Sequence, residues 1–117
     1  KLEAESNIFM QLRRALRDVK REQLSSVVIV YEPVWAIAPN PPADPEYVKV
    51  MVQTLRRALA RQGSKRIAAN TRILYGGSVS ASNAAQFAAI EGLDGAVPGT
   101  ASRSAEEFLS TTRAFSG

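Results

Sequence analysis

Cysteine and histidine are both missing from this 117-residue chain. Without cysteine there is no disulfide framework and no thiolate metal ligand. Without histidine, an imidazole cannot act as general base, electrophile or zinc ligand. Long apolar runs are missing too, since none approaches the ~20 residues that a membrane-spanning helix needs. We therefore expect a protein that has no metal site, does not contact membranes and lies in the cytoplasm.

Acidic residues are outnumbered, and the formal net charge is +4. The cations gather in two segments in which apolar residues recur at helical spacing, a pattern typical of solvated helix faces. Aromatic side chains that would stack on bases are not interleaved with them. We expect no nucleic-acid partner, and a basic module that binds nucleic acid is the alternative from a different class. The cations are Arg13, Arg14, Arg17, Lys20 and Arg21, then Arg56, Arg57, Arg61, Lys65 and Arg66.

Apolar periodicity predicts four helices that alternate with three strands. The run Val27–Tyr31 is apolar on both faces, as in a parallel strand covered on both sides, and Pro33 ends it. Asp44 is a candidate N-cap, and Ser104 opens a candidate capping box with Glu107. The predicted helices cover 6–21, 45–62, about 80–91 and 105–115, and the predicted strands cover 27–31, 73–75 and 93–97.

This alternation predicts an α/β fold in which parallel strands are joined by right-handed crossovers. The carboxyl ends of the strands then meet at one rim, which carries Glu32 and the loops 75–78 and 98–102. A carboxylate beside loops that expose backbone N–H groups suggests proton transfer on a phosphorylated small molecule. From spacing alone, simpler interpretations stay open: Glu32 as a surface carboxylate, the glycine pair 76–77 as a tight turn, and Ser102 and Ser104 as helix caps.

Three motifs narrow these alternatives. The segments Tyr31-Glu32-Pro33-Val34-Trp35-Ala36-Ile37, Tyr75-Gly76-Gly77-Ser78-Val79, and Asp94-Gly95-Ala96-Val97 followed by Gly99-Thr100-Ala101-Ser102 resemble the triosephosphate isomerase family in identity and order. The similarity runs from about Glu3 to the C-terminus. It implies that residues 1–117 are the C-terminal part of a (β/α)8 barrel domain, with its last three strands and four helices.

The resemblance also implies an activity. Members of this family interconvert dihydroxyacetone phosphate and glyceraldehyde 3-phosphate in glycolysis and gluconeogenesis, without cofactor or metal. By motif match, Glu32 is the base that moves a proton through an enediolate, and backbone N–H groups of Ala38, Ser78, Gly99 and Thr100 bind the substrate phosphate. A mobile lid is implied for Pro33, Val34, Trp35, Ala36, Ile37, Ala38, Pro39, Asn40, Pro41, Pro42 and Ala43.

The chain departs from the family pattern in its loops. Where the family has Ala-Ile-Gly-Thr-Gly after the tryptophan, this lid contains Pro39, Pro41 and Pro42, each of which fixes φ and removes a donor. We therefore expect a stiffer lid or one with a different closed shape. Thr100 replaces a family glycine, and because glycine permits positive φ and close backbone approach to an anion, we expect weaker or altered phosphate binding.

The largest departure concerns the electrophile. The family takes its catalytic histidine and lysine from earlier strands, and this chain has no histidine. We expect the isolated chain to be inactive, the missing part of the barrel to come from an N-terminal portion or a second chain, and the complete protein to be a homodimer. Two alternatives remain: a non-catalytic phosphosugar-binding relative, and an isomerase of a related four-carbon phosphosugar.

Overall fold

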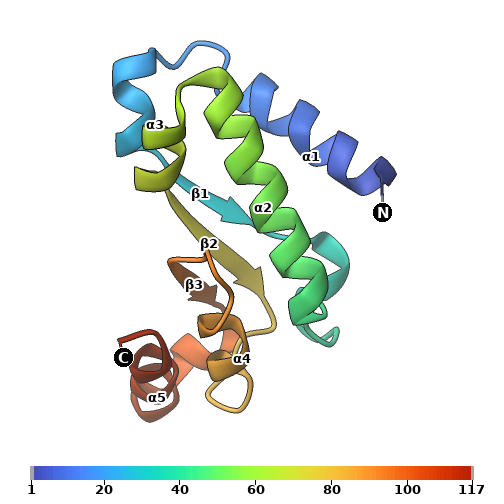
Figure 1. Cartoon of the computed structure of the whole chain (residues 1–117). Helices are drawn as coiled ribbons and strands as arrows, with labels where there is room; N and C mark the ends of the chain where they lie inside the picture. Colours follow the sequence, from blue (N-terminus) through green and yellow to red (C-terminus); the bar gives the residue numbers. More distant parts are fainter. Residues whose placement is uncertain (1, 117) are drawn as a thin grey trace.

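Three parallel strands form a single sheet in the computed structural model, which describes residues 2–116. The strands are β1 (Val28–Tyr31), β2 (Arg72–Gly77) and β3 (Gly95–Pro98), in the order β1-β2-β3 (Figure 1). Tyr31 pairs with Tyr75, and Gly77 pairs with Pro98. This register brings the carboxyl ends of the strands to one edge of the sheet. The predicted α/β class is confirmed.

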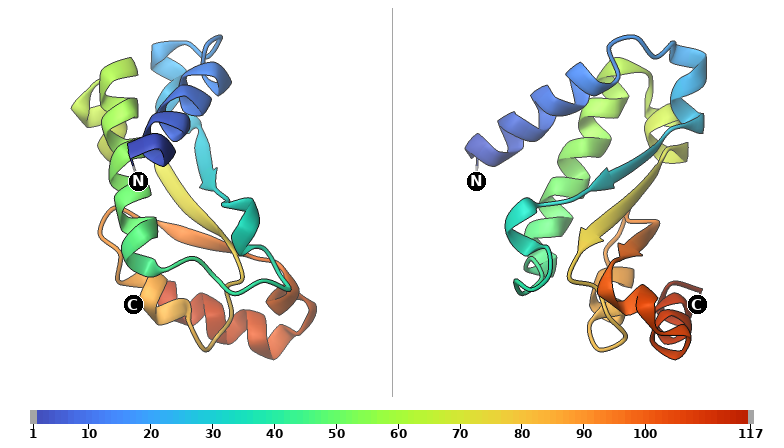
Figure 2. Two further views of the ribbon diagram at one scale, coloured as in Figure 1. Left: turned by 90° about the vertical axis from the view of Figure 1, so that its right-hand side faces the viewer. Right: turned by 180° about the vertical axis from the view of Figure 1, so that it is seen from behind.

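The described residues form five α-helices where four were predicted, together with three short 3₁₀ helices. Helices α1 and α2 pack against each other, and α4 packs against α5 nearer the C-terminus (Figure 2). No helix in the described part of the chain is long and apolar enough to cross a membrane. The helices are α1 (Leu2–Ala15), α2 (Pro45–Gln62), α3 (Lys65–Asn70), α4 (Ala84–Ala88) and α5 (Ala105–Ser116), and the 3₁₀ helices are Arg21–Ser26, Val34–Ala36 and Thr100–Arg103.

Helix α2 supplies much of the core, and its predicted apolar stripe is buried. Helix α2 covers one face of the sheet, where Ile73 and Tyr75 are fully buried. Tyr75 stacks on Phe87 with ring centroids 4.4 Å apart, so β2 is also fixed to α4. The buried stripe consists of Val48, Met51, Val52, Leu55 and Leu59.

The opposite face of the sheet is open. Val28 is 50% exposed, Val30 44% and Val97 43%. The prediction that the first strand is buried on both faces is therefore wrong for this chain, because helices cover only the side toward which Tyr31 points. Three strands cannot close into a barrel, so the face that would line a barrel interior stays in contact with solvent.

Several element boundaries also differ from the prediction. Helix α1 ends at Ala15 rather than at residue 21, and 21–26 forms a separate 3₁₀ turn. Helix α4 is shorter than predicted because Asn83 ties the preceding loop into a turn, accepting from the Ser80 amide at 2.9 Å and donating to the Ser78 carbonyl at 2.8 Å. The unpredicted α3 begins after Ser64, whose side chain caps it by accepting from the Ile67 amide.

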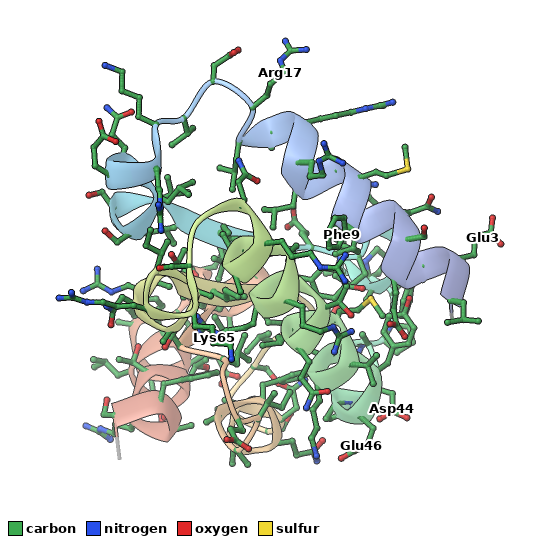
Figure 3. All side chains as sticks on the ribbon, turned by 45° about the horizontal axis from the view of Figure 1, so that its top comes forward. Glu3, Phe9, Arg17, Asp44, Glu46 and Lys65 are labelled. Carbon is green, nitrogen blue, oxygen red and sulfur yellow. The ribbon has the colours of Figure 1, made fainter. Side chains whose placement is uncertain are left out.

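Helix α2 begins as predicted. The Asp44 carboxylate accepts a hydrogen bond from the Glu46 amide at 2.9 Å, and both side chains lie at the start of the helix (Figure 3). An N-cap aspartate satisfies one unpaired N–H of the first turn and favours the positive end of the helix dipole. Because α2 also contributes heavily to the core, its cap acts on the stability of the whole chain.

We predict that Asp44→Ala lowers the free energy of unfolding by about 1 kcal/mol, the usual cost of losing such a cap. Urea unfolding followed by circular dichroism measures this. Asp18→Ala is the matched control, since Asp18 is exposed and its ion pair with Arg17 spans 3.8 Å at the surface. Equal effects of the two changes would contradict the role given to the cap.

Arg56, in α2, connects the amino ends of β2 and β3 to the helices around them. Its guanidinium group donates to the Gly92 carbonyl at 2.5 Å and pairs with the Asp94 carboxylate at 2.9 Å. Asp94 in turn accepts from the Ile73 amide at 2.8 Å, which explains why β3 begins at Gly95 rather than at residue 93 as predicted. Arg56 donates in addition to the carbonyls of Ala68 and Thr71.

Candidate active site

A pocket of about 570 Å³ lies at the carboxyl ends of the strands. It is lined by Glu32 and by Ala38, Ser78, Gly99 and Thr100, the residues that the sequence singled out as base and phosphate ligands. They come from loops that follow three different strands, and the parallel register brings them together. The remaining lining residues are Ile37, Gly77, Val79, Ser80, Val97, Ala101 and Glu107.

Glu32 follows β1 directly and its side chain is exposed to the pocket. It lies over Gly76 of the neighbouring strand. A methyl group at Gly76 would be 3.2 Å from Glu32 Oε1 and 3.1 Å from Val30 Cγ1. Those distances are tighter than ordinary van der Waals contact, so a side chain at position 76 would press on the Glu32 carboxylate and on Val30 and displace them slightly.

Ser78 is in contact with the lid through both its backbone and its side chain. Its amide donates to the Ala36 carbonyl at 2.9 Å, and its hydroxyl donates to the Asn40 carbonyl at 2.5 Å. The sequence predicted that the Ser78 N–H group binds phosphate, and here that group is engaged by the lid. An anion at this position has to share the N–H group with Ala36 or displace its carbonyl.

Gly99 and Thr100 lie where β3 passes into a 3₁₀ helix. The first N–H groups of a helix have no partner inside it, and they favour an anion. Gly99 has φ −83°, and no non-glycine residue described by the structure has positive φ. Thr100 therefore does not adopt the positive φ that favours glycine, and the expected weakening or alteration of phosphate binding stays a prediction.

The lid is anchored at Ala36 and Ala43, and residues 37–42 between them are exposed. Ala36 and Ala43 are buried, and the Ala43 amide donates to the Tyr75 hydroxyl at 3.0 Å. Val34 is 78% exposed, and Trp35 is half-exposed with its ring edge-on to Tyr47 at 5.5 Å between centroids. The carboxyl end of β2 therefore carries the contacts that hold this lid.

Two buried tyrosines lie beneath the lid. Burial raises the pKa of Tyr75, although the hydrogen bond from the Ala43 amide acts in the opposite direction. Burial likewise raises the pKa of Tyr31, and the neighbouring Tyr47 adds to this shift. In both cases the folded chain holds the phenolic proton more strongly than an unfolded chain does.

We predict that stability falls in alkaline solution. Below the unfolded tyrosine pKa of about 10 the contribution of each phenol is fully present. Above it the unfolded chain ionises first, so stability falls by up to about 1.4 kcal/mol per pH unit for each tyrosine until the folded pKa is reached. Urea unfolding between about pH 8 and about pH 11 measures this loss. Tyr31→Phe should make the pH dependence shallower, and an unchanged dependence would refute the assignment.

Two further site residues were missed from the sequence. Glu107 lines the pocket and accepts from the Ala81 amide at 2.9 Å, whereas the capping-box pattern had assigned its side chain to the start of α5. Only half of that box forms, through the bond from the Glu107 amide to the Ser104 hydroxyl. Asn83 supports the Ser78 loop, and no local motif marked it. Within residues 2–116, no three acidic side chains converge as a metal site would require.

The two basic segments are partly neutralised. Arg56 is bound to the Thr71 carbonyl and to the Asp94 carboxylate. Arg57 pairs with Glu5 at 3.4 Å and Arg17 with Asp18 at 3.8 Å. Many of the remaining cations are exposed, as the interpretation of solvated helix faces predicted.

A parallel α/β sheet with its pocket at the carboxyl ends of the strands defines part of a (β/α) barrel of the TIM type. The sequence profile of the family described as triosephosphate isomerase matches residues 1–115. This chain belongs to the triosephosphate isomerase family.

Curated relatives agree with this assignment. The triosephosphate isomerase of Roseiflexus castenholzii is 42% identical over 106 residues, which cover 91% of this chain and 42% of the relative. That of Chloroflexus aurantiacus is 41% identical over 107 residues, covering 92% and 43%. That of Thermus thermophilus is 41% identical over 103 residues, covering 88% and 41%. The chain thus spans about two fifths of the length of the curated relatives that it matches.

Proposed function

We propose that this chain supplies the catalytic base and much of the phosphate site of a triosephosphate isomerase, which interconverts dihydroxyacetone phosphate and glyceraldehyde 3-phosphate. The observation that supports the proposal is the shared pocket of Glu32 with Ala38, Ser78, Gly99 and Thr100. Its volume of about 570 Å³ suits a small ligand. In the complete protein we place this activity in glycolysis and gluconeogenesis, in a cytoplasmic homodimer.

The roles follow from the chemistry of the groups. Glu32 removes a proton from the hydroxyl-bearing carbon of the bound triose phosphate to give an enediolate and returns it to the neighbouring carbon. The proton of the hydroxyl oxygen passes to the former carbonyl oxygen, so that the two isomers interconvert with no net change in protons. The backbone N–H groups of the cradle hold the phosphate and so keep the reacting carbons beside the carboxylate. The lid over this pocket excludes water from the enediolate.

The negative charge that develops on the enediolate oxygen needs a hydrogen-bond donor to stabilise it. Removing one such donor from an enzyme typically costs about 3–4 kcal/mol of transition-state stabilisation. The 117 residues contain no histidine, and Glu107, the other carboxylate in the pocket, acts as an acceptor for the Ala81 amide. We therefore propose that the donor comes from the N-terminal part of the barrel or from a second chain, and that the isolated chain is inactive.

Reconstitution tests the proposal. The chain is assayed alone and after addition of the N-terminal part of a relative's barrel that precedes the matched region. We expect no turnover from the chain alone and turnover after reconstitution. In the reconstituted protein, Glu32→Gln should lower the rate of turnover by about 10²–10⁴-fold. Glu22→Gln, an exposed substitution outside the pocket, is the control. Turnover by the isolated chain would refute the inactivity, and a reconstituted rate insensitive to Glu32→Gln would refute the base.

A non-catalytic phosphosugar-binding relative is the second candidate. It is favoured by the bond between the Ser78 amide and the Ala36 carbonyl, which occupies a phosphate donor. A phosphorylated enediolate mimic separates the two candidates, because an enzyme binds such a mimic at least about 100-fold more tightly than substrate. Equal affinities in the reconstituted protein would favour the binding protein.

A further inference from the structure

Glu107 connects two of the segments that surround the candidate active site. Of the described residues of α5, it alone lines the pocket, and its side chain is partly buried. Its Oε1 atom accepts a hydrogen bond at 2.9 Å from the amide of Ala81, which lies in the loop between β2 and α4. A side chain from the helix that follows β3 therefore holds the loop that follows β2.

The loop that contains Ala81 is a cross-linked turn. The Asn83 side chain accepts from the Ser80 amide at 2.9 Å and donates to the Ser78 carbonyl at 2.8 Å. The Ser80 carbonyl also accepts from the Asn83 amide at 3.2 Å. Because Ala81 lies inside this turn, a bond that fixes Ala81 also limits the movement of Ser78.

The bond to Glu107 joins two parts of the predicted phosphate site. The turn at residues 78–83 provides one candidate phosphate ligand, and the segment 99–107 provides two more. The ladder of paired strands stops just before both, with Gly77 opposite Pro98. Beyond that pair, the part of the chain that the structure describes has one hydrogen bond between the two segments, and it is the one that Glu107 accepts.

We propose that Glu107 is a positioning residue of the phosphate site. Its carboxylate holds the turn at residues 78–83 where its N–H group and those of Gly99 and Thr100 reach the same phosphate. The carboxylate also carries a negative charge in that pocket, and this charge repels a phosphate. Its two effects on phosphate binding are therefore opposite in sign. This role rests on the proposed function, because it requires that the site bind a phosphate.

Two substitutions at position 107 separate the support from the charge. The 117-residue chain is titrated with inorganic phosphate, and the amide signals of Gly99 and Thr100 are followed by nuclear magnetic resonance. Glu107→Ala should weaken binding at least about threefold, the order expected for one hydrogen bond in contact with water, although it removes a negative charge. Glu107→Gln should bind phosphate at least as tightly as the unsubstituted chain, because an amide oxygen still accepts from Ala81. Tighter binding by both variants would show that only the charge matters and would overturn the role.

Glu106→Ala is the matched control for charge. Glu106 lies in the same first turn of α5, is exposed and does not line the pocket. Its substitution makes the same change in net charge beside the same helix end. We expect phosphate affinity to change by less than about twofold, since exposed charges outside a site contribute little. Equal weakening by Glu106→Ala and Glu107→Ala would overturn the role of Glu107.

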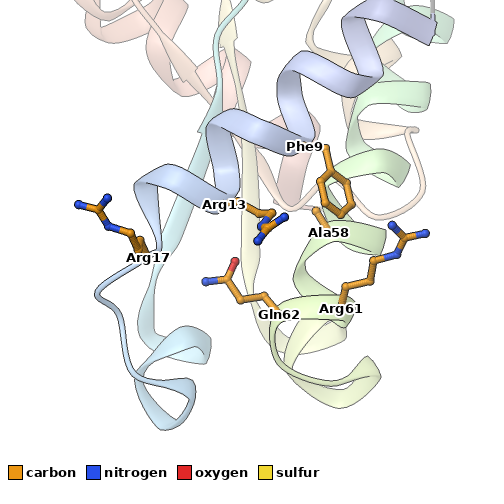
Figure 4. A pocket seen from close by; sticks show the side chains of 6 residues that line it. All are labelled: Phe9, Arg13, Arg17, Ala58, Arg61 and Gln62. Carbon is orange, nitrogen blue, oxygen red and sulfur yellow. The ribbon is translucent and has the colours of Figure 1, made fainter.

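Gln62→Ala is the control for stability. Gln62 lines the hollow of about 460 Å³ between α1 and α2 (Figure 4), which shares no lining residue with the candidate active site. Its side-chain nitrogen donates to the Leu16 carbonyl at 3.0 Å, so this variant also loses a bond between two segments. It should lower stability in urea and leave phosphate affinity within about twofold, because distant sites act independently. Weakening equal to that of Glu107→Ala would attribute the effect to lost stability and contradict the proposal.

The same spectra test the position of the turn without ligand. Glu107→Ala should speed hydrogen exchange at the Ala81 amide and shift the Ser78 amide signal, and Glu107→Gln should leave both close to those of the unsubstituted chain. An unchanged Ser78 signal in Glu107→Ala, or unchanged phosphate affinity, would contradict the role of Glu107 alone. Failure of phosphate to shift Gly99 and Thr100 in the unsubstituted chain would instead contradict the phosphate site of the proposed function, and the role of Glu107 with it.

Discussion

Replacing Arg56 by alanine should lower the free energy of unfolding by about 2–3 kcal/mol, because it leaves part-buried carbonyl acceptors without their donor. The side chain is only 19% exposed. Its removal takes the donor away from the carbonyls of Thr71 and Gly92 and leaves Asp94 without its cation. Most of the loss comes from the part-buried carbonyls of Ala68 and Thr71, because an unpaired buried acceptor costs about 1–3 kcal/mol. The Gly92 carbonyl is exposed and Asp94 is 41% exposed, so water partly compensates both.

Arg56→Lys should recover only a minor part of this loss. An ammonium group cannot reach several acceptors in one plane as the guanidinium group does. Urea unfolding followed by circular dichroism gives the free energies. Arg66→Ala is the matched control, because Arg66 is an exposed residue of the neighbouring helix α3; it should change stability by no more than about 0.5 kcal/mol. A loss below about 1 kcal/mol for Arg56→Ala would show that the network does not hold the sheet to its helices.

Arg56 also illustrates what the sequence could not provide. It was placed with the other cations on a solvated helix face, because its own helix gives no sign of the carbonyls that surround it. Those carbonyls belong to α3, to Thr71 directly after it and to the loop before β3, and the furthest, that of Gly92, is 36 positions away in the chain. Asp94 was assigned to a strand for the same reason, and the structure uses its side chain to bind Arg56 and the Ile73 amide.

Features that depend on residues close together in the sequence were predictable. Asp44, Pro45 and the apolar stripe of α2 specify where that helix begins and which side is buried, and all of this is found. The convergence of Glu32 with the loops at Ser78 and Gly99 followed from parallel topology together with the motifs, and the structure brings these residues into one pocket. The bond between the Ser78 amide and Ala36 was not predictable, because it depends on how the lid lies across β2.

Gly77 has the strictest spatial requirement at the site. A methyl group there would collide with the Tyr75 hydroxyl and lie 3.2 Å from the Ala36 carbonyl oxygen. Tyr75 cannot move away easily, because it is fully buried, stacks on Phe87 and accepts from the Ala43 amide. The added carbon therefore presses on both points that hold the lid.

We predict that Gly77→Ala lowers the free energy of unfolding by about 2–3 kcal/mol, as overpacking of a close-packed interior does. It should also change the fluorescence of Trp35, which is the only tryptophan and lies in the lid. Gly99→Ala is the matched control in the same pocket. Nothing lies within 4 Å of a methyl group at Gly99 and its φ is −83°, so we expect a change below about 0.5 kcal/mol.

A double-mutant cycle with Tyr75→Phe identifies the cause. Tyr75→Phe alone leaves the Ala43 amide without its acceptor and should cost about 1–3 kcal/mol. Removing the hydroxyl also removes the atom nearest the new methyl group, so the double variant should be more stable than the sum of the single effects implies, by at least about 0.5 kcal/mol. Strict additivity would show that the contact with the Tyr75 hydroxyl is not what destabilises Gly77→Ala, and would leave the ring carbon Cζ, 2.7 Å from the added methyl group, as the point of collision.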